Sequence, residues 1–320
     1  MNEKFIFVIN PKAGKNNRAM NFIGNIKAAC KVYNIDSEIY ITKAVGDACE
    51  FVKNRCKALS ETTRFYACGG DGTINEVING AVGCPYAKVG ILPLGSGNDY
   101  IKSFPGVDFL NLPAQIMGKP RAVDLIRIGD RYVANMCNIG FDAKVGHNFV
   151  KFKRIPGVSG KAAYTLSVFY CIVSKISTPM IITLDDGTEI SDNMLLCSVS
   201  KGLYCGGQYK SSPLANPYDG YMDVCPIKTL SRPQFLSFFE IYKKGEHINN
   251  PKLEPWVSYH KCKKMTIKSA EKIPIAYDGD IGYLNGTITF EVVPQAIEII
   301  IPELATEIDL QDKKIASEIL

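Results

Sequence analysis

The chain has 320 residues, enough for two domains, and its 46% hydrophobic and 22% charged residues are typical of a globular protein and exclude a disordered one. A net charge of +5 is too small to indicate a duplex-binding protein, but it suits an anionic ligand or an anionic membrane surface. The 11 cysteines include no Cys-x-x-Cys pair, which argues against a zinc site or a disulfide scaffold and favours free thiols in a reducing cytosol.

Two apolar stretches bear on membrane association. Residues 5–9 form an apolar run that follows Glu3 and is too short for a signal peptide. The longest apolar stretch, residues 162–176, falls short of the ~20 residues that a membrane span needs. We therefore expect a cytoplasmic protein that meets a membrane only at its surface. Residues 162–176 are expected to form a buried core helix, with the lining of an acyl groove as the alternative.

The first third of the chain alternates between strand and helix patterns. Continuous apolar runs predict strands, and apolar residues at helical spacing predict helices. Such alternation indicates a parallel sheet with helices on both faces. The strands are expected at residues 4–10, 38–42, 64–68 and 88–94, and the helices at 22–33, 48–59 and 74–82.

The pattern changes after about Asp124, where short strand-like runs become frequent and several are joined by Asp-Gly turn signals. This predicts an antiparallel β domain, interrupted by helices near residues 160–176 and 233–244. The polar residues after Pro302 are assigned no role. The strands are expected at residues 123–128, 132–138, 180–184, 193–199, 221–227, 265–269, 273–277, 287–293 and 297–301.

The motif at residues 69–73, GGDGT, lies between the third predicted strand and the helix that follows it. Consecutive glycines let backbone N–H groups approach an anion, and the helix N-terminus adds a partial positive charge. Asp71 would repel a phosphate unless Mg²⁺ bridges the two groups. Thr73 suits an N-cap or a phosphate donor. Taken alone, the motif also fits a glycine-rich turn with an Asp cap.

Two further loops have the same character. Residues 93–99 (PLGSGND) end the fourth predicted strand, and residues 10–15 (NPKAGK) end the first. Because ligands bind beyond the carboxyl ends of the strands in an open α/β sheet, the three loops are expected to converge on one anion site. The chain has no G-x-x-x-x-G-K-[ST] loop, no G-x-G-x-x-G after the first strand and no protein-kinase signature, which excludes those nucleotide-binding classes.

These blocks resemble, in order and spacing, the nucleotide-binding blocks of the soluble bacterial diacylglycerol kinases, a lipid kinase family that includes sphingosine and ceramide kinases. Later blocks are also similar: Asp124 in AVDLI, IGFDA at 139–143, ANPYDGYMDV at 215–224 and YDGD at 277–280. The resemblance extends to about Pro302. GGDG alone would not identify the family, because NAD kinases and phosphofructokinases also have it.

The resemblance implies an α/β ATP-binding domain at residues 1–128 and a β-rich antiparallel sandwich domain that binds the lipid at 129–300. A C-terminal segment of about 300–320 is expected to return to the first domain. The implied activity is transfer of the γ-phosphate of ATP to a lipid hydroxyl, with the conversion of diacylglycerol to phosphatidic acid preferred. The alternatives are an NAD kinase and a nucleotide-binding regulatory protein that has lost catalysis.

The resemblance also implies the residues that bind ATP and Mg²⁺. Asp71, Asp99 and Asp124 would form a carboxylate network around one Mg²⁺. The nucleotide site would comprise Asn10, Pro11, Lys12, Gly14, Thr42, Gly69, Gly70, Asp71, Gly72, Thr73, Asn75, Glu76, Gly95, Ser96, Asn98 and Asp99.

A second, structural Mg²⁺ is implied near residues 216–221. There Asp219 would contribute its side chain, and Asn216 and Tyr221 their backbone carbonyls. Without the resemblance, Asp219-Gly220 would be interpreted as a hairpin turn.

The family's candidate catalytic base lies in an Asp-Gly-acid element, which here reads Asp278-Gly279-Asp280 where the family usually has Asp-Gly-Glu. Asp278 or Asp280 is expected to accept the proton of the lipid hydroxyl, and a type I′ turn is the alternative interpretation. Ser96 stands where the family usually has Thr, and it keeps the hydroxyl.

The expected partner is a lipid at the membrane surface, and no nucleic acid is expected. Residues 149–155 combine aromatic and basic side chains that could dock on an anionic surface. A solvated basic loop with two core phenylalanines explains them equally well. An exposed edge strand in the β domain would allow a homodimer. The motifs around the phosphates do not identify the lipid acceptor.

Overall fold

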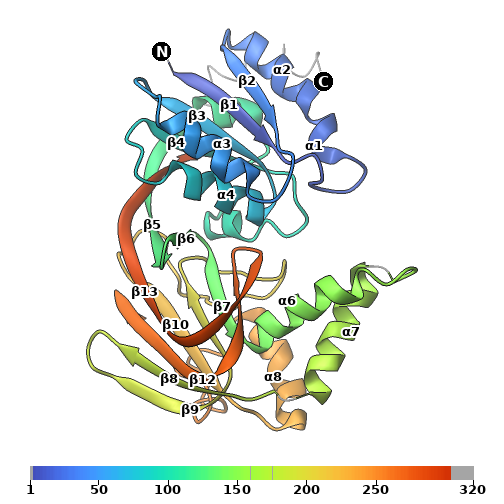
Figure 1. Cartoon of the computed structure of the whole chain (residues 1–320), viewed down its shortest axis with the longest axis vertical. Helices are drawn as coiled ribbons and strands as arrows, with labels where there is room; N and C mark the ends of the chain where they lie inside the picture. The colour runs from blue at the N-terminus through green and yellow to red at the C-terminus, as the bar shows by residue number, and fades with distance from the viewer. Residues whose placement is uncertain (1–2, 159, 175, 304–320) are drawn as a thin grey trace. The chain divides into compact units, whose positions relative to one another are not determined.

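The computed structural model describes residues 3–303, except 159 and 175. The chain divides into two compact units (Figure 1). The first comprises residues 3–124 and 294–303, and the second comprises Leu125–Val293. The sequence had placed this division after residue 128. Most of the C-terminal segment of about 300–320 that was expected to return to the first domain lies outside the described residues.

The first unit contains a parallel sheet in the order β4-β3-β1-β2, made of β1 (Lys4–Ile9), β2 (Ser37–Ile41), β3 (Thr63–Gly69) and β4 (Ala87–Pro93). Nearly every residue of β1, β3 and β4 is buried, which explains their continuous apolar runs. The last residues of the long strand β13 (Asp280–Ile301) extend the sheet, because they pair in parallel with Lys88 and Val89 of β4.

Helices cover both faces of this sheet (Figure 1). Alternate strand residues such as Phe7 and Cys68 pack against Ile26 and Ile116, which come from α2 and α5. α3 packs on α4, which lies against β3 and β4. The helices of this unit are α1 (Arg18–Asn21), α2 (Ile23–Val32), α3 (Asp47–Cys56), α4 (Asp71–Ala81) and α5 (Leu112–Met117), with a 3-10 helix at Tyr100–Ser103.

The second unit is built on antiparallel pairing in the order β11-β10-β9-β7-β12-β13. β8 also pairs with both β9 and β12, so that β7 and β8 occupy successive stretches between the same two strands. The strands are β6 (Arg131–Val133), β7 (Met136–Gly140), β8 (Thr178–Leu184), β9 (Glu189–Ser200), β10 (Met222–Lys228), β11 (His260–Cys262) and β12 (Lys264–Tyr277), together with the last residues of β5 (Lys119–Ile128), which begins in the first unit.

Two apolar clusters stabilise this unit. One lies among the strands and includes Ile139, Ile182 and Phe290. The other joins the sheet to the helices α6 (Phe141–Phe152), α7 (Gly160–Val173) and α8 (Arg232–Lys244), through residues such as Phe141 and Phe235. The predicted fold class, an α/β domain followed by a β-rich one, is confirmed.

Several details differ from the sequence prediction. α5 and α6 were not expected as helices. β12 is one long strand where two were expected, because its pairing with β13 continues across a register shift between Ser269 and Ile273. β13 is likewise one strand where two were expected. The prediction of a buried core helix at residues 162–176 was wrong for one face of α7, where the Phe169 side chain is 64% exposed. Among the described residues, no helix is both long enough and apolar enough to cross a membrane.

Candidate functional site

The loops that follow β1, β3 and β4 meet at the carboxyl edge of the parallel sheet. The side-chain amide of Asn10 donates to the Thr73 hydroxyl at 3.1 Å, and the Asn10 backbone N–H donates to Cys68 at 3.0 Å. The backbone N–H of Gly95 donates to the Gly69 carbonyl at 3.0 Å. These hydrogen bonds link the three loops, so the structure brings together the three motifs that are separate in sequence.

Glycine is required where two of these loops cross. A Cβ atom on Gly95 would lie 2.4 Å from the Cα of Gly70, and one on Gly69 would lie 2.3 Å from the Thr73 hydroxyl. Gly14 has φ of 78°, and a Cβ there would lie 2.6 Å from the Leu94 carbonyl oxygen. Only glycine permits this close approach of backbone to backbone.

Asp71 and Asp99 form a pair of neighbouring carboxylates at this edge. A Cβ built on Gly97 would lie 3.1 Å from Asp71 Oδ2 and 3.6 Å from Asp99 Oδ2. Burial and the negative charge of Asp99 raise the pKa of the Asp71 carboxyl, although the backbone amide of Tyr100 donates to it at 3.1 Å. Lys102 pairs with Asp99 at 2.6 Å. Two close carboxylates, one with a raised pKa, are stabilised when a cation binds beside them.

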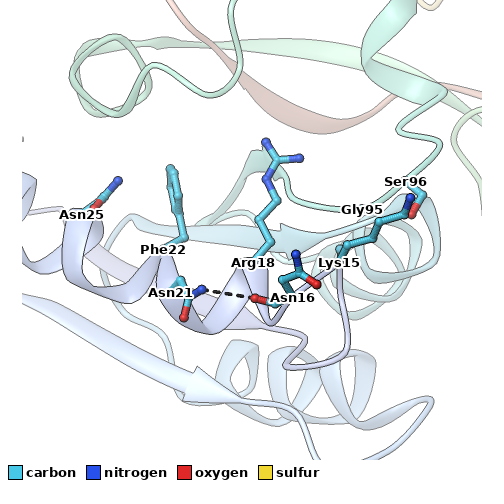
Figure 2. A pocket seen from close by; sticks show the side chains of 9 residues that line it. Lys15, Asn16, Arg18, Asn21, Phe22, Asn25, Gly95 and Ser96 are labelled. Atoms are coloured by element: carbon cyan, nitrogen blue, oxygen red, sulfur yellow. Dashed lines mark hydrogen bonds between the residues drawn. The ribbon is translucent and has the colours of Figure 1, made fainter.

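A pocket of about 700 Å³ opens beside these loops (Figure 2). Gly14, Gly95 and Ser96 contribute to its wall from two of the predicted motifs. Of the remaining lining residues, Lys15 belongs to the first predicted loop, and the others, which were not predicted, follow this loop and continue into α1 and α2. In Figure 2, Arg18 and Phe22 point to the same side of the helix. These remaining residues are Lys15, Asn16, Arg18, Asn21, Phe22 and Asn25.

Some predicted ATP-binding residues have structural partners. Both carboxylate oxygens of Glu76 accept from the backbone N–H groups of Gly46 and Ala48 at 2.9 and 3.1 Å, and thereby cap the N-terminus of α3. Asn75 accepts a hydrogen bond from the side chain of Asn79. The Thr42 backbone extends the pairing of β1 through a 2.9 Å hydrogen bond to Ile9.

The remaining predicted residues of this site lie in the three loops. Lys12 is exposed and follows Pro11 in the turn after β1, where its N–H donates to Asn10 Oδ1 at 3.0 Å. Gly72 lies in the first turn of α4. Asn98 has φ of 50° and donates to the Pro93 and Gly95 carbonyls, while its buried Oδ1 atom has no hydrogen-bond partner among the residues that the structure describes.

Asp124 is buried, and its Oδ1 atom accepts from the backbone N–H of Gln295 at 3.0 Å. Within residues 3–303, apart from the two omitted positions, no three carboxylate, imidazole or thiol groups are close enough together to hold one metal ion. The structure therefore brings together Asp71 and Asp99, and it does not group Asp124 with them as a three-carboxylate cation site.

In the second unit, Asp278 and Asp280 have different environments. Asp278 has φ of 45° and is buried, and its carboxylate accepts from the backbone N–H groups of Ala134, Asn135 and Met136 at 2.6, 3.1 and 3.0 Å. The Asp280 side chain is 46% exposed and pairs with Arg131 at 3.1 Å. The first carboxylate fixes the turn, and the second is open to solvent.

The second expected cation site contains a lysine. Lys201 Nζ donates to Asp219 Oδ1 at 2.9 Å and to the Tyr221 carbonyl at 2.6 Å. Asp219 Oδ2 accepts from Lys261 at 2.6 Å, and the Asn216 side chain accepts from the Tyr218 N–H. Two of the three expected ligands therefore already bind an ammonium group, and the site does not fit a Mg²⁺ ion.

Two family models match this chain. The diacylglycerol kinase catalytic domain matches residues 4–128, and the YegS C-terminal NAD kinase beta sandwich-like domain matches residues 135–301. The chain is 26% identical over 301 residues to a diacylglycerol kinase of Staphylococcus carnosus, a match that covers 88% of this chain and 90% of the relative. It is also 26% identical over 251 residues to a diacylglycerol kinase of Bacillus subtilis, covering 77% and 80%.

A solved structure has the same fold. The crystal structure of a diacylglycerol kinase from Bacillus anthracis strain Sterne superposes with a TM-score of 0.67 at 21% sequence identity, covering 93% of this chain and 96% of that one.

Proposed function

The chain belongs to the bacterial diacylglycerol kinase family of lipid kinases, and we propose that it transfers the γ-phosphate of ATP to the free hydroxyl of diacylglycerol, which yields phosphatidic acid. Membership of the family makes the chain a kinase that uses ATP and a lipid. The choice of diacylglycerol as acceptor is the proposal.

The observation that carries the phosphoryl-transfer part of this proposal is the pocket beside the three glycine loops. Lys15 and Arg18 supply positive charge at its wall, and Gly95 and Ser96 supply a backbone segment and a hydroxyl. Backbone N–H groups in glycine loops, together with cations, are the groups that recognise phosphates. A volume of about 700 Å³ is within the range of small-molecule sites, so the pocket has room for a nucleotide.

Asp71 and Asp99 fit one side of a Mg²⁺ site, because the ion in nucleotide complexes is usually held by one or two carboxylates and by substrate phosphates. Burial and the neighbouring Asp99 raise the pKa of Asp71, so a cation beside the two carboxylates would stabilise the charged form. A Mg²⁺ ion held there would neutralise charge on the transferred phosphoryl group. Phosphate oxygens, and not Asp124, are expected to complete its coordination.

We infer that Asp280 accepts the proton of the acceptor hydroxyl, and that Asp278 positions the turn that carries it. A carboxylate that accepts three amide hydrogen bonds is stabilised as an anion and is a weak base. Asp280 is half exposed, and its partner Arg131 is itself exposed. In the reaction, the acceptor oxygen bonds to the γ-phosphorus, the bond from that phosphorus to the β–γ bridging oxygen breaks, and ADP leaves.

Access to a lipid acceptor is proposed to come from the outer face of α7, which packs beside α6 (Figure 1). The exposed residues Leu166, Phe169, Tyr170 and Val173 recur at the three- and four-residue spacing of one helix face. The opposite face, with Ala163 and Cys171, is buried.

Basic residues lie near this apolar face. Lys151 and Lys153 are exposed at the end of α6, which packs on α7, and Arg154 is exposed directly after them. An exposed apolar stripe beside basic side chains suits an anionic bilayer surface.

Phosphate transfer from labelled ATP with Mg²⁺ tests the proposed acceptor. The panel contains diacylglycerol, phosphatidylglycerol and a sphingoid base in mixed micelles, and NAD in solution. Transfer to diacylglycerol that is lost in Asp71→Asn supports the proposal. Transfer to another lipid alone would keep the lipid kinase and replace the acceptor, and transfer to NAD alone would overturn the lipid acceptor altogether.

A further inference from the structure

Lys201 is a buried cation at the end of an apolar strand. Its side chain has no exposed surface, although it extends from β9, whose last seven residues are all buried. An ammonium group is rarely buried unless carboxylates or carbonyl oxygens surround it. Lys201 Nζ finds both kinds of oxygen, in Asp219 at 2.9 Å and in Tyr221 at 2.6 Å.

The charged groups around Lys201 form ion pairs with one another among the described residues of this unit. Asp219 pairs with Lys201 and with Lys261, and Lys261 also lies 3.5 Å from Asp223. Two carboxylates therefore face two ammonium groups. Burial opposes the ionisation of Asp219, but the hydrogen bonds from the two lysines lower the pKa of its carboxyl. A divalent ion placed on the same oxygens would add two uncompensated positive charges.

The backbone of Lys201 connects this cluster to the candidate catalytic turn. Its N–H donates to the Asn135 carbonyl at 2.8 Å, and the Asn135 N–H donates to the Asp278 carboxylate at 3.1 Å. Asn135 also donates through its side chain to the Tyr204 carbonyl at 2.9 Å. Lys201, whose ammonium group binds the Asp219 turn, therefore also binds Asn135 through its backbone, and Asn135 in turn binds Asp278.

We propose that the ammonium group of Lys201 takes the place of the structural divalent cation that the family resemblance implied, so that this chain holds residues 216–221 without a metal ion. Lys201 is then a positioning residue, because it acts through the Asp219 turn and through Asn135. The proposal concerns the stability of the second unit and does not depend on which lipid is phosphorylated.

Hydrogen–deuterium exchange of residues 216–222, without nucleotide, tests the proposal. The wild-type protein is expected to show the same protection in EDTA and in millimolar Mg²⁺. Lys201→Ala in EDTA should exchange several-fold faster and melt on the order of 10 °C lower, because it leaves the oxygens of Asp219 and Tyr221 without their buried partner. Millimolar Mg²⁺ should restore most of that loss, because the vacated oxygens then accept the ion.

The matched control is Lys261→Ala, which removes the more exposed lysine from the same carboxylate and should show little change and no effect of Mg²⁺. Protection of the wild-type segment that rises with Mg²⁺ would overturn the proposal. A Lys201→Ala protein that is destabilised and that Mg²⁺ does not rescue would overturn it as well. If this variant does not fold in either condition, Lys201→Asn carries the same test, because its side-chain oxygen can ligate a cation.

Discussion

The carboxylate of Asp278 lies 2.6 Å from the backbone nitrogen of Ala134, and the next two backbone amides donate to the same carboxylate. Asp278→Asn replaces one acceptor oxygen by an NH₂ group that faces these donors. We expect this change to lower the free energy of unfolding by about 1.5–3 kcal/mol, the range for hydrogen bonds to a charged group. Urea denaturation measures the loss, and an unchanged midpoint would contradict the anchoring role of Asp278.

Asp280 should behave in the opposite way. Asp280→Asn is expected to change the unfolding free energy by less than about 0.5 kcal/mol, because the side chain is half exposed, and to lower kcat by roughly 10²–10⁴-fold, because general base catalysis is lost. Asp280→Glu, which adds the methylene that the family usually has, is the control and should retain activity. Equal loss of activity in Asp280→Asn and Asp280→Glu would show that the carboxylate is not the proton acceptor.

The basic wall of the pocket should determine the affinity for ATP. Arg18→Ala is expected to raise KM for ATP roughly tenfold and to leave KM for the lipid unchanged, because the loss of one charge-assisted contact to a phosphate costs about 1.5 kcal/mol. Lys27→Ala removes an exposed cation of α2 that does not line the pocket, and it should have no effect. Initial rates at varied ATP separate the two variants, and a similar KM in both would remove Arg18 from the site.

The buried carboxyl of Asp142 should make stability depend on pH. Burial raises its pKa to about 6 despite a hydrogen bond from the Tyr242 hydroxyl, whereas the ordinary value is 3.8. Between these values the folded protein keeps a proton that the unfolded chain releases, so stability falls as pH rises from 4 to 6. Asp142→Asn should remove this fall, which amounts to about 3 kcal/mol by linkage.

Urea midpoints at several pH values, for the wild type and for Asp142→Asn, isolate this group. The exposed Asp130→Asn serves as the control and should follow the wild type. Parallel pH profiles for the wild type and Asp142→Asn would mean that Asp142 titrates normally.

The exposed face of α7 should govern membrane binding. Phe169→Glu is expected to weaken binding to anionic phospholipid vesicles roughly tenfold or more, because the lost burial of a phenylalanine costs about 2 kcal/mol. Activity on a short-chain, water-soluble diacylglycerol should be unchanged. Val45→Glu is the control, since Val45 is 88% exposed in the first unit. Vesicle sedimentation that does not distinguish the two variants would exclude α7 as the docking surface.

Local signals were sufficient to predict most of the first unit. The continuous apolar runs of β1, β3 and β4 are distinct because these strands are buried on both faces. The missed helices also had signals. Asn111 caps α5 by accepting from the Ala114 N–H at 3.0 Å, and Pro113 lies in the first turn of this helix. In α6, Phe141, Val145 and Phe152 follow helical spacing.

The role of Lys201 had no such local signal. A lysine at the end of an apolar run is usually the point where a strand reaches solvent. Its partner Asp219 lies 18 residues further along the chain, and only the pairing of β9 with β10 brings the two together. Glu76 is similar, because the backbone N–H groups that donate to its carboxylate lie 28 and 30 residues away, at the N-terminus of α3. Long-range contacts of this kind depend on the tertiary fold.

The first unit is made of two chain segments that the second unit separates in sequence, so it is completed only late in synthesis. β4 gains its neighbour on one side only when residues 298 and 299 of β13 pair with Lys88 and Val89, and the ribosome makes these residues after the whole second unit. Until then, the nascent chain carries a parallel sheet with an unpaired edge at a buried, apolar strand. Completion of the first unit therefore has to wait until the second unit has been synthesised, and the edge of β4 stays open to pairing with another strand until then.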